Sequence, residues 1–406
     1  MCGVTKTVVE NKSSTISSVH ENGSTRNHHS EGAIINLDHG DPTIYESYWK
    51  KLGEMSRVTF LGHQSLSYFS NKKNFCWFLE PKLEEEIKNI HNMVGNAIVE
   101  DRHIVVGTGS SQLIQAALYA LSDHSLNEPN TISVVSASPY YSAYQEIADL
   151  LRSGLFKWAG DARSFDKDGP YIEMVTSPNN PDGIIRQGLV NRPNGVLIHD
   201  LAYYWPQYTA ITSPADHDIM LFTLSKSTGH AGSRIGWALV RDKDVAKKMV
   251  KFMEINSIGV SKEAQIRAAT ILEIICGSCS QSVKPNIDLD NFFEYNKNLM
   301  AERWKRLRDV VKKNDIFYVT KYPIQYCNFT GDFTEAYPAF AWMKCKLEGV
   351  DCEKLFKEHK ILTRSGRRFG CDPEYVRISM LSGDDDFDLF IQRLSTIIGS
   401  QSLNDN

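Results

Sequence analysis

The chain has 406 residues, which exceeds the size at which one hydrophobic core stops growing, so we expect two packed units. Apolar residues make up 42% and charged residues 23%, values that are typical of globular proteins and not of disordered, fibrous or membrane proteins. The net charge of -4 excludes the basic surplus with which a protein neutralises nucleic acid.

The 8 cysteines are scattered and show no dense framework of the kind found in small secreted proteins, which predicts reduced thiols. Cys276 and Cys279 have the spacing of a redox or zinc motif, but no second pair or His cluster completes it. We therefore expect an ordinary helix end and no metal. No secretory signal and no apolar run of roughly 20 residues is present, so we expect a cytoplasmic protein that does not bind membranes. Import into an organelle stays open.

Residues 1–30 are rich in Ser, Asn, Thr and His and poor in large apolar side chains, so we expect a flexible tail. From Ile34 onward the chain is expected to be globular. Pro81 suits the first turn of a helix, and apolar residues follow it at helical spacing. The expected core-facing residues of this helix are Leu83, Ile87, Ile90 and Val94.

Between about Asp101 and Val240, short β-rich runs alternate with helical patterns, which predicts a mostly parallel sheet covered by helices. Each run is short and largely apolar, as buried parallel strands are. The expected strands are Ile104 to Val106, Ile132 to Val135, Ile172 to Val175, Val196 to Ile198, Met220 to Thr223 and Gly236 to Val240.

The first of these strands leads into a turn with Gly107 and Gly109 and then into a helical pattern that begins near Ser110. Backbone N–H groups at such a helix start can bind a phosphate. A nicotinamide dinucleotide site would need a third glycine where Gln112 stands, and an acidic residue at the end of a second strand. Neither is present, which disfavours that cofactor, and the turn alone leaves phosphate binding open.

The third strand is followed by the segment Thr176-Ser-Pro-Asn-Asn-Pro-Asp-Gly183, whose prolines and glycine predict a rigid turn. A turn does not by itself explain Asn180. Its amide is held before a proline beyond the carboxyl end of a strand, where parallel sheets bind ligands.

The fourth strand ends at Asp200, with Tyr203 three residues later. A carboxylate at the end of a buried strand is costly unless it has a charged or hydrogen-bonding partner. A protonated pyridine nitrogen would be such a partner, and Tyr203 could offer its phenol to a ring oxygen.

The most specific segment runs from Leu221 to Trp237, where an apolar strand leads to Ser225 and Lys226 in a glycine-rich loop. Arg234 follows eight residues after the lysine. Burial of such a lysine lowers its pKa and frees the amine to attack an aldehyde. The alternative, a surface lysine, is disfavoured by the apolar flank and the glycines.

A helix is expected from about Asn291 to Lys313, and its length suggests that it joins the two units. Its broad apolar stripe comprises Tyr295, Leu299, Met300, Trp304, Leu307 and Val311. Strands and helices of a smaller unit follow. The chain is expected to end with a helix that starts at the acidic residues 384–386 and buries Phe387, Phe390, Leu394 and Ile397.

Together, the phosphate turn, the stiff Asn, the strand-end Asp and the Ser-Lys loop occur in the order found in fold-type I pyridoxal-phosphate enzymes, which the chain resembles. It is most similar to the plant tryptophan aminotransferases of auxin synthesis, a branch of the alliinase-like group. The similarity extends from about Asn36 to the C-terminal helix. The segments that carry it are Asn36-Leu-Asp-His-Gly-Asp-Pro-Thr43, Asn74-Phe-Cys-Trp-Phe-Leu-Glu-Pro81, Ser177-Pro-Asn-Asn-Pro-Asp-Gly183 and Ser225 to Trp237.

The resemblance implies an α/β fold-type I transferase that forms a homodimer. A large domain at residues 68–300 would contain a mostly parallel central sheet, and a smaller α/β domain would combine residues 31–67 with residues 301–406. The cofactor would be pyridoxal 5′-phosphate.

The resemblance also implies roles for the cofactor-contacting residues. Lys226 would be the Schiff-base lysine and the catalytic base. Asp200 would face the pyridine nitrogen, with Asn180 and Tyr203 on the ring hydroxyl. The phosphate would be held by Ser110, Ser111, Ser225 and Arg234, with Tyr68 reaching it from the partner subunit.

Tyr140 is expected to stack on the cofactor ring, although Tyr141 beside it leaves the register open. Gly40 and Arg377 would bind the substrate, with Arg377 gripping its carboxylate as a bidentate fork. Judged from its own surroundings in the sequence, Arg377 would be a charge at the edge of a strand.

The implied reaction transfers the amino group of L-tryptophan to a 2-oxo acid, pyruvate or 2-oxoglutarate, and yields indole-3-pyruvate. An alliinase-like carbon–sulfur lyase would share every cofactor contact, but such lyases carry a cysteine-rich module, and only Cys2 and Cys76 precede Cys276 here. A non-catalytic protein that retains the fold is disfavoured by the intact cofactor set. Phe75, Trp77 and Phe369 are candidates for reading the indole ring and fit the core equally well.

Overall fold

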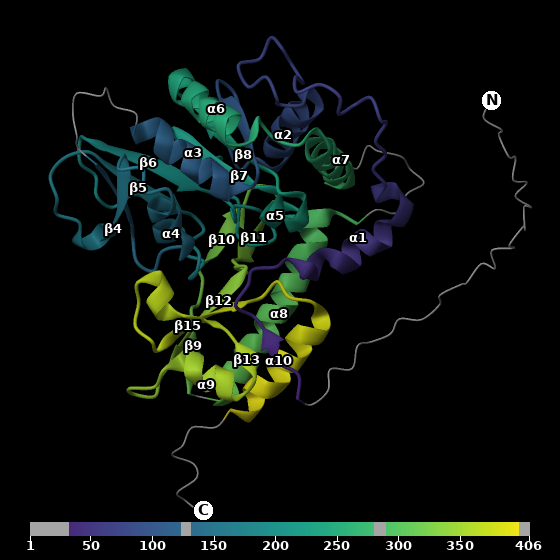
Figure 1. Ribbon diagram of the computed structural model, residues 1–406. Coiled ribbons are helices and arrows are strands. Elements are labelled where there is room, and N and C mark those ends of the chain that lie inside the picture. The colour runs from purple at the N-terminus through teal and green to yellow at the C-terminus, as the bar shows by residue number, and fades with distance from the viewer. Residues whose placement is uncertain (1–31, 123–130, 280–289, 315, 398–406) are drawn as a thin grey trace, which may run out of the picture.

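The computed structural model of the protein describes residues 32–122, 131–279, 290–314 and 316–397, and Figure 1 shows an upper and a lower unit. We call residues 81–279 the large unit, and residues 317–397 together with the first strand the small unit. The tail expected at residues 1–30 lies outside the described residues.

The large unit is built around a seven-stranded sheet with the order β2-β8-β7-β6-β5-β3-β4. Its strands are β2 (His103–Gly107), β3 (Ile132–Ser136), β4 (Phe156–Asp161), β5 (Tyr171–Thr176), β6 (Gly195–Asp200), β7 (Ile219–Thr223) and β8 (Gly236–Val240). All are parallel except β8, which is antiparallel to both neighbours. The mostly parallel sheet and all six predicted strands are confirmed. The additional strand, β4, has a single neighbour and a half-exposed surface, so it lacks the continuous apolar run of the others.

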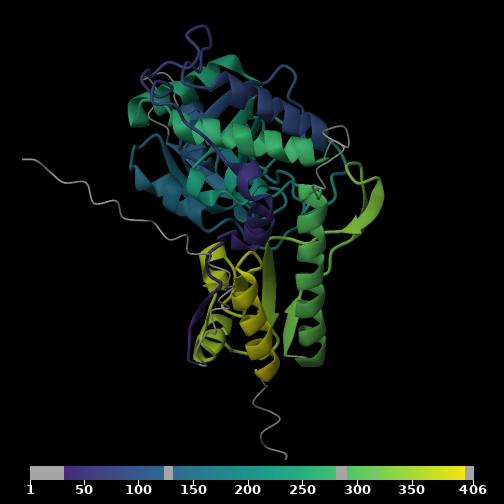
Figure 2. The ribbon, with the colours of Figure 1, turned by 90° about the vertical axis from the view of Figure 1, so that its right-hand side faces the viewer.

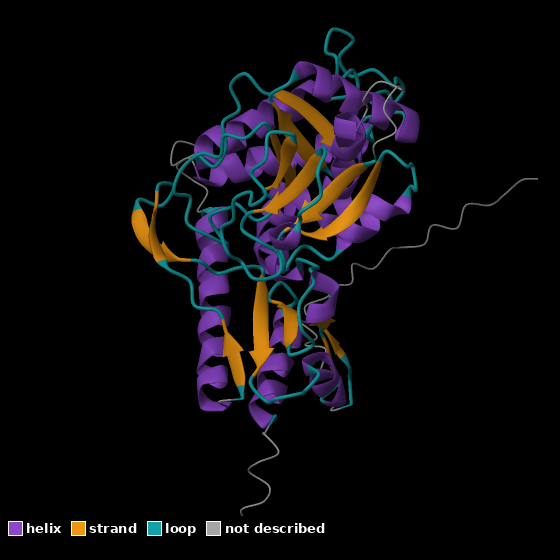
Figure 3. Cartoon of the chain, turned by 90° about the vertical axis from the view of Figure 1, so that its left-hand side faces the viewer, coloured by secondary structure: helices purple, strands orange, loops and turns teal. Residues whose placement is uncertain are grey.

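Helices cover both faces of this sheet (Figure 3). They are α2 (Pro81–Val94), α3 (Ser110–Ser122), α4 (Ala143–Leu150), the single turn α5 (Leu224–Ser227), α6 (Lys243–Ser257) and α7 (Lys262–Cys279). The four residues predicted to form the core face of α2 are all buried. Cys276 and Cys279 lie in the last turn of α7, which confirms the predicted helix end. Across the described ranges, every helix is too short or too polar to cross a bilayer.

The small unit contains an antiparallel sheet with the order β14-β15-β12-β9. Its elements are β9 (Phe317–Val319), β12 (Phe340–Cys345), α9 (Cys352–Glu358), β13 (Ile361–Leu362), β14 (Arg364–Ser365), β15 (Tyr375–Ser379) and α10 (Asp384–Thr396). Near the N-terminus, β1 (Ile35–Asn36) pairs in parallel with β13, so the start of the described chain is anchored in the small unit. The predicted C-terminal helix is confirmed as α10.

Three features connect or extend these units. After β1, α1 (Glu46–Leu52) packs near the start of α8 (Phe292–Asn314), and α8 runs along the small unit up to the large unit (Figure 2). Since α8 continues unbroken through residue 300, the domain boundary predicted there is not marked by a helix end and stays a prediction. A hairpin of β10 (Ile324–Cys327) and β11 (Asp332–Glu335) stands out from the body (Figure 2). The short 3-10 turns are η1 (Thr43–Tyr45), η2 (Gly53–Ser56), η3 (Ala162–Ser164), η4 (Ala231–Ser233) and η5 (Gly366–Phe369).

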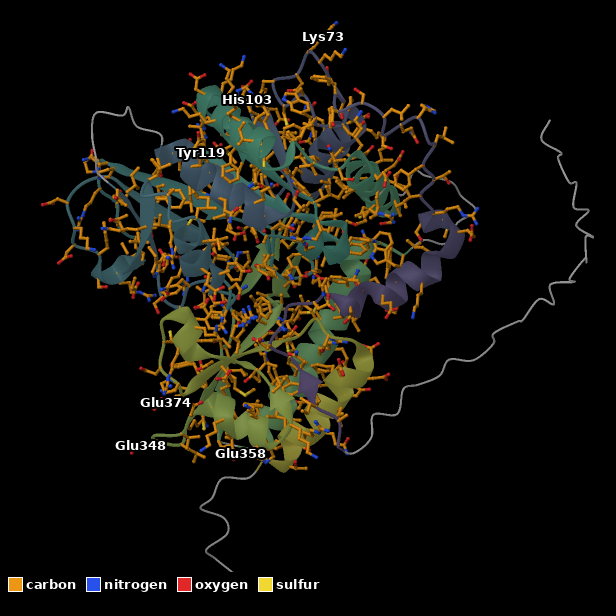
Figure 4. All side chains as sticks on the ribbon, in the orientation of Figure 1. Lys73, His103, Tyr119, Glu348, Glu358 and Glu374 are labelled. Atoms are coloured by element: carbon orange, nitrogen blue, oxygen red, sulfur yellow. The ribbon has the colours of Figure 1, made fainter. Side chains whose placement is uncertain are left out.

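One edge of the large sheet collects the carboxyl ends of its parallel strands. The register places Gly107 beside Gly236, and Gly236 beside Thr223. Thr176 is paired with Asp200 in the same way. The loops that follow β2, β5, β6 and β7 therefore open together toward the small unit. The opposite edge is marked by His103 at the start of β2, near the top of the molecule in Figure 4.

A buried hydrogen-bond chain fixes the loop that follows β6. Trp237 Nε1 donates to His91 Nε2 at 2.9 Å, and His91 Nδ1 lies 2.8 Å from Asn96 Oδ1. In this network His91 is neutral with its proton on Nδ1, because Nε2 accepts a hydrogen bond. Asn96 Nδ2 then donates to the carbonyl of Tyr204 at 2.7 Å. Burial lowers the pKa of His91 to about 4, although its hydrogen bond to Asn96 opposes the shift.

The low pKa of His91 predicts an acid-sensitive fold. The unfolded chain binds a proton at this site near pH 6.5, whereas the folded chain resists until about pH 4, so stability falls as the pH drops through this range. For this group alone the loss between pH 7 and pH 5 is about 2 kcal/mol. Urea unfolding at both pH values should show a shallower pH dependence for His91→Gln than for the unmodified protein. Equal pH dependence in the two proteins would contradict the assignment.

Candidate active site

The backbone around Lys226 is held at both ends of the short helix α5. At its start, the Thr223 hydroxyl accepts a hydrogen bond from the Ser225 N–H at 3.3 Å, as an N-cap does. At its end, Gln207 Nε2 donates to the carbonyls of Lys226 (3.3 Å) and Ser227 (3.0 Å). The Tyr208 hydroxyl also donates to the Lys226 carbonyl, at 3.1 Å. These bonds satisfy carbonyls that a one-turn helix leaves open and fix the direction of the lysine side chain.

The amine of Lys226 donates a hydrogen bond to the carbonyl of Gly40. A Cβ atom at Gly40 would lie 2.7 Å from the Phe340 ring and 3.2 Å from Lys226 Nζ, so only glycine permits this approach. Burial lowers the pKa of Lys226 to about 8, and the charge of Arg377 adds to this shift while Asp41 opposes it. A substantial fraction of the amine is thus neutral and nucleophilic near physiological pH.

A cleft of about 590 Å³ lies beside the loop that follows Lys226. One wall includes Asp41 and Trp49, and the other is formed by the glycine-rich residues 229–233. Because Asp41 directly follows Gly40, this cleft borders the backbone that accepts the amine's hydrogen bond.

Asp200 ends β6 with its carboxylate buried. The Tyr144 hydroxyl donates to Oδ2 at 2.8 Å, and the N–H of Ala202 donates to Oδ1 at 3.2 Å. Burial raises the pKa of Asp200, and the hydrogen bonds from Tyr144 and Ala202 limit that rise. Within the parts of the chain that the structure describes, no ion pair compensates this carboxylate. A cationic ring nitrogen would supply the missing partner.

Arg377 lies on β15, between β14 and β12, and is 2% exposed. The expectation of a strand-edge charge, drawn from its own sequence surroundings, is therefore wrong, because the pairing of three short strands could not be read from the sequence. Its Nη1 donates to Asn180 Oδ1 at 3.1 Å and its Nη2 donates to the Asp38 carbonyl at 2.5 Å. The guanidinium lies 4.0 Å from the centroid of the Phe340 ring.

The guanidinium of Arg377 keeps unused binding capacity. Its Nε is buried without a hydrogen-bond partner among the described residues. Burial lowers the pKa of Arg377 to about 10, and the neighbouring charge of Arg364 adds to the shift, but the group stays cationic at neutral pH. A buried, partly unsatisfied cation of this kind fits the carboxylate of a substrate.

The turn between β2 and α3 brings Gly109 against Arg234. Gly109 has a φ of +77°, and a Cβ atom there would lie 2.5 Å from Arg234 Nη2. Ser110 opens α3 and Ser111 follows it, while Ser225 lies buried in α5. The exposed Arg234 guanidinium therefore lies over a helix start, and the combination of a cation with helix N–H groups suits a phosphate.

The structure separates the two adjacent tyrosines whose register the sequence leaves open. The Tyr140 ring packs edge-on against Trp158 at a centroid distance of 4.9 Å, and a Cβ atom at Gly370 would collide with it. The Tyr141 ring instead contacts Tyr144, the residue that bonds Asp200. Burial raises the pKa of Tyr141, and the nearby charge of Arg377 opposes that shift. Tyr141 therefore lies among the residues around Asp200, whereas Tyr140 faces Trp158, and which of the two stacks on a cofactor ring stays a prediction.

The other predicted residues fall into two groups. Tyr203 is buried between Tyr208 and Phe340, with Arg377 close enough to influence its pKa, which burial raises. The structure thus brings Tyr203 together with Lys226, Asp200, Asn180, Arg377 and Gly40. Tyr68, in contrast, is 72% exposed, and in the described residues no hydrogen bond joins it to the rest of the site.

The three candidates for reading an indole ring lie in different places. Phe75 packs on His103 at the amino end of β2, on the far edge of the sheet from Lys226. Trp77 contacts Phe69 and Phe78 in the same region. Phe369 is fully buried, and the Arg377 guanidinium lies 5.3 Å from its ring centroid, so it is part of the site wall.

Sequence reasoning missed three residues that contact the site. Tyr144 bonds Asp200, and the ion pair of Asp38 with Arg364 lies beside Arg377. Tyr144 could have been found from its position four residues after Tyr140, on the helix that follows the second predicted strand. Arg364 carries no such signal, because Arg367 and Arg368 stand close to it in the sequence.

These surroundings fit pyridoxal phosphate. The uncompensated carboxylate of Asp200 suits the ring nitrogen, and the amine of Lys226 suits the aldehyde. The Gly109 turn under Arg234 leaves no room for a side chain and suits the phosphate. These three groups follow strands that end at the same edge of the sheet, so they lie within one site.

Comparison with known protein families identifies one that covers almost the whole described chain. The Alliinase_C family model, described as allinase, matches residues 35–398. The chain is 55% identical over 368 residues to tryptophan aminotransferase-related protein 2 of Arabidopsis thaliana, covering 90% of this chain and 82% of that protein. It is 37% identical over 375 residues to alliin lyase of Allium cepa var. aggregatum, covering 90% and 82% of the two chains.

Solved structures share the fold at low sequence identity. An aminotransferase from Staphylococcus aureus matches with a TM-score of 0.63 and 20% identity, covering 92% of this chain and 96% of that one. The aspartate aminotransferase of Thermus thermophilus with maleate matches with a TM-score of 0.63 and 15% identity, covering 89% and 91%. The predicted α/β fold of the fold-type I transferases is thus confirmed.

The crowding at Gly109 predicts a specific effect on cofactor affinity. Gly109→Ala would place a methyl group against the Arg234 guanidinium and would strain a backbone with positive φ. The dissociation constant for pyridoxal 5′-phosphate, measured by fluorescence quenching, should rise about 10-fold or more, the equivalent of roughly 1.4 kcal/mol. Gly232→Ala, in the loop that carries Arg234, is the control, because nothing lies within 4 Å of its added Cβ atom. Equal dissociation constants in the two variants would contradict the placement of the phosphate.

The lowered pKa of Lys226 predicts how cofactor uptake depends on pH. Protonated amine cannot attack an aldehyde, so the uptake rate of the apoprotein should rise with pH up to about 8 and then level off. Stopped-flow absorbance between pH 6 and pH 10 would measure this midpoint. Asp41→Asn removes a charge that raises the pKa of Lys226, so its midpoint should shift to lower pH. A midpoint near 10.5, the ordinary value for lysine, would refute the burial argument.

Proposed function

Since this chain belongs to the alliinase family, we propose that it is a pyridoxal-phosphate-dependent aminotransferase that converts L-tryptophan to indole-3-pyruvate. The acceptor would be a 2-oxo acid, pyruvate or 2-oxoglutarate. The observation that carries the proposal is the meeting of Lys226, Asp200 and Arg377 where the two units join. An amine, a carboxylate and a carboxylate-binding cation are the groups that amino transfer requires.

The degree of similarity favours amino transfer over the lyase alternative. Three relatives named tryptophan aminotransferase-related proteins, from Arabidopsis thaliana and rice, are 50% to 55% identical to this chain. The alliin lyases are 35% to 37% identical. The choice of tryptophan as donor rests on those names.

The cofactor would be held by residues from several loops of one sheet edge. When bound, pyridoxal phosphate supplies an aldehyde that condenses with amines and a ring that accepts the electrons left at the substrate's Cα. Asp200, oriented by Tyr144, would keep the ring nitrogen protonated. Asn180 and Tyr203 would bind the ring hydroxyl, with Tyr141 covering the ring. The phosphate would be bound by Ser110, Ser111, Ser225 and Arg234.

A residue of the small unit would bind the substrate, and a residue of the large unit would act as the catalytic base. Arg377 would bind the carboxylate that both the amino acid and the 2-oxo acid carry, using its unpaired Nε. Lys226 would act as the base that removes the proton from the substrate's Cα and delivers it to the cofactor's C4′ carbon. Its pKa of about 8 suits this role because the amine can both accept and release a proton near neutral pH.

We further propose that the enzyme is a homodimer in which Tyr68 reaches the phosphate of the partner subunit. The segment around Tyr68 exposes several large apolar side chains, which single proteins rarely leave in contact with water. They are Met55, Leu61, Leu66, Tyr68 and Phe69. A cytoplasmic location and a role in auxin biosynthesis complete the proposal.

The proposal is tested by product analysis. The purified protein, incubated with L-tryptophan and pyruvate, should form indole-3-pyruvate and alanine in equal amounts, and Lys226→Ala should lower the rate at least 1,000-fold, because a covalent nucleophile and base is lost. Borohydride reduction followed by peptide mapping should place the cofactor on residue 226.

The same assay separates the alternatives. An S-alkyl cysteine sulfoxide replaces the amino acid in a parallel reaction, with no 2-oxo acid added. Rapid pyruvate and ammonia release from it, with no keto acid from tryptophan, would refute amino transfer in favour of carbon–sulfur cleavage. A protein that takes up no cofactor would refute both enzymes.

A further inference from the structure

We propose that Arg364 is a positioning residue: through its contacts with Asp38 and Ser142 it holds Arg377 in the position in which Arg377 binds the substrate carboxylate. The inference rests on the proposed function, because it assigns a role to residues around the same substrate site. It concerns three segments that are distant in the sequence and meet beside Arg377: residues 38–40, the start of α4, and β14.

Arg364 contacts two of these segments from the third. Its Nε donates to Asp38 Oδ1 at 2.5 Å and its Nη2 donates to Oδ2 at 3.3 Å, which makes a two-point contact with the carboxylate. Its Nη1 donates to the Ser142 hydroxyl at 3.0 Å. A single side chain from the small unit thus ties the N-terminal segment to the large unit.

Arg364 binds the Asp38 side chain in the segment 38–40, and the backbone carbonyls of this segment accept hydrogen bonds from Arg377 and Lys226. The Asp38 carbonyl accepts from Arg377 Nη2, and two residues later the Gly40 carbonyl accepts from Lys226 Nζ. A shift of residues 38–40 would therefore move the partner of the carboxylate-binding group. Arg364 opposes such a shift because it fixes the Asp38 side chain from the opposite side.

The charges explain why this arrangement favours an incoming carboxylate. Arg364 and Arg377 stand directly opposite each other on β14 and β15, where two like charges repel. Asp38 lies against Arg364, and the charges of Arg364 and Arg377 hold the pKa of Asp38 below its usual value although burial alone would raise it. The carboxylate of Asp38 thus offsets one of the two positive charges of Arg364 and Arg377. The uncompensated positive charge lies on Arg377, whose Nε has no hydrogen-bond partner among the described residues.

Ser142 allows the link to the large unit to be tested by itself. It occupies the N-cap position of α4, yet its side chain makes no capping hydrogen bond there. Its hydroxyl accepts from Arg364 instead. Ser142→Ala therefore removes the contact without removing a helix cap, and Ser142→Thr restores a hydroxyl.

The neighbouring pair of Arg368 and Glu146 provides a matched control. It also joins the small unit to α4, with a nitrogen-to-oxygen distance of 3.0 Å, but both side chains are more than half exposed. Exposed pairs contribute little, and this one does not touch residues 38–40. Arg368→Met should therefore leave the kinetics unchanged.

The experiment compares holoenzyme variants by steady-state kinetics. Asp38→Asn and Arg364→Lys should raise the KM for the amino acid and for the 2-oxo acid about 10-fold, and Ser142→Ala about 3-fold, because each weakens hydrogen bonds to a charged group. The kcat should stay within about 2-fold, since carboxylate binding is shared by ground and transition states. Ser142→Thr should restore the KM. Unchanged KM values, or a fall in kcat alone, would overturn the proposal.

A binding measurement separates this proposal from the proposed function. Indole-3-propionate carries the carboxylate but no amino group, so its dissociation constant from the holoenzyme, measured by calorimetry, does not depend on turnover. It should rise in Arg364→Lys, Asp38→Asn and Ser142→Ala and stay constant in Arg368→Met. If the parent protein transaminates no amino acid but binds this acid in an Arg364-dependent way, the proposed function fails and the positioning role stands. Equal binding by all variants overturns the positioning role.

Discussion

The chemistry of this site depends on the exclusion of water from three ionisable groups at the junction of two units. Burial disfavours the charged form of each group, so it lowers the pKa of Lys226 and Arg377 and raises that of Asp200. The consequences differ because the groups differ. The lysine becomes a usable nucleophile, the carboxylate requires a cationic partner, and the arginine, whose ordinary pKa is much higher, stays charged and seeks an anion.

Much of the fold could be predicted because its strongest signals are local. The six apolar strand runs and the periodic helices α2, α8 and α10 each bury a continuous face, which the spacing of apolar residues reveals. The small unit was harder to predict. Its strands are two to six residues long, and the pairing of β1 with β13 joins segments more than 300 residues apart. No local pattern reports such a contact.

The site residues also divide into those that local sequence patterns predict and those that depend on contacts between distant segments. Lys226, Asp200 and Asn180 lie at strand ends, where topology alone predicts ligands, and the structure places them together. Their roles, like that of Tyr68, stay predictions. Tyr144 and Arg364 were missed because their importance comes only from what they touch, and the choice between Tyr140 and Tyr141 depended on which side of the loop faces Trp158.

The antiparallel strand β8 keeps Lys226 and Arg234 within the large unit. Because β8 returns the chain beside β7, Lys226 and Arg234 are delivered by one short connection within the large sheet. Arg377 comes from the other unit. In the proposed function, the coenzyme would be bound by residues of the large unit and the substrate carboxylate by a residue of the small unit. Changes in the small unit would then alter the binding of the amino acid without altering the coenzyme site.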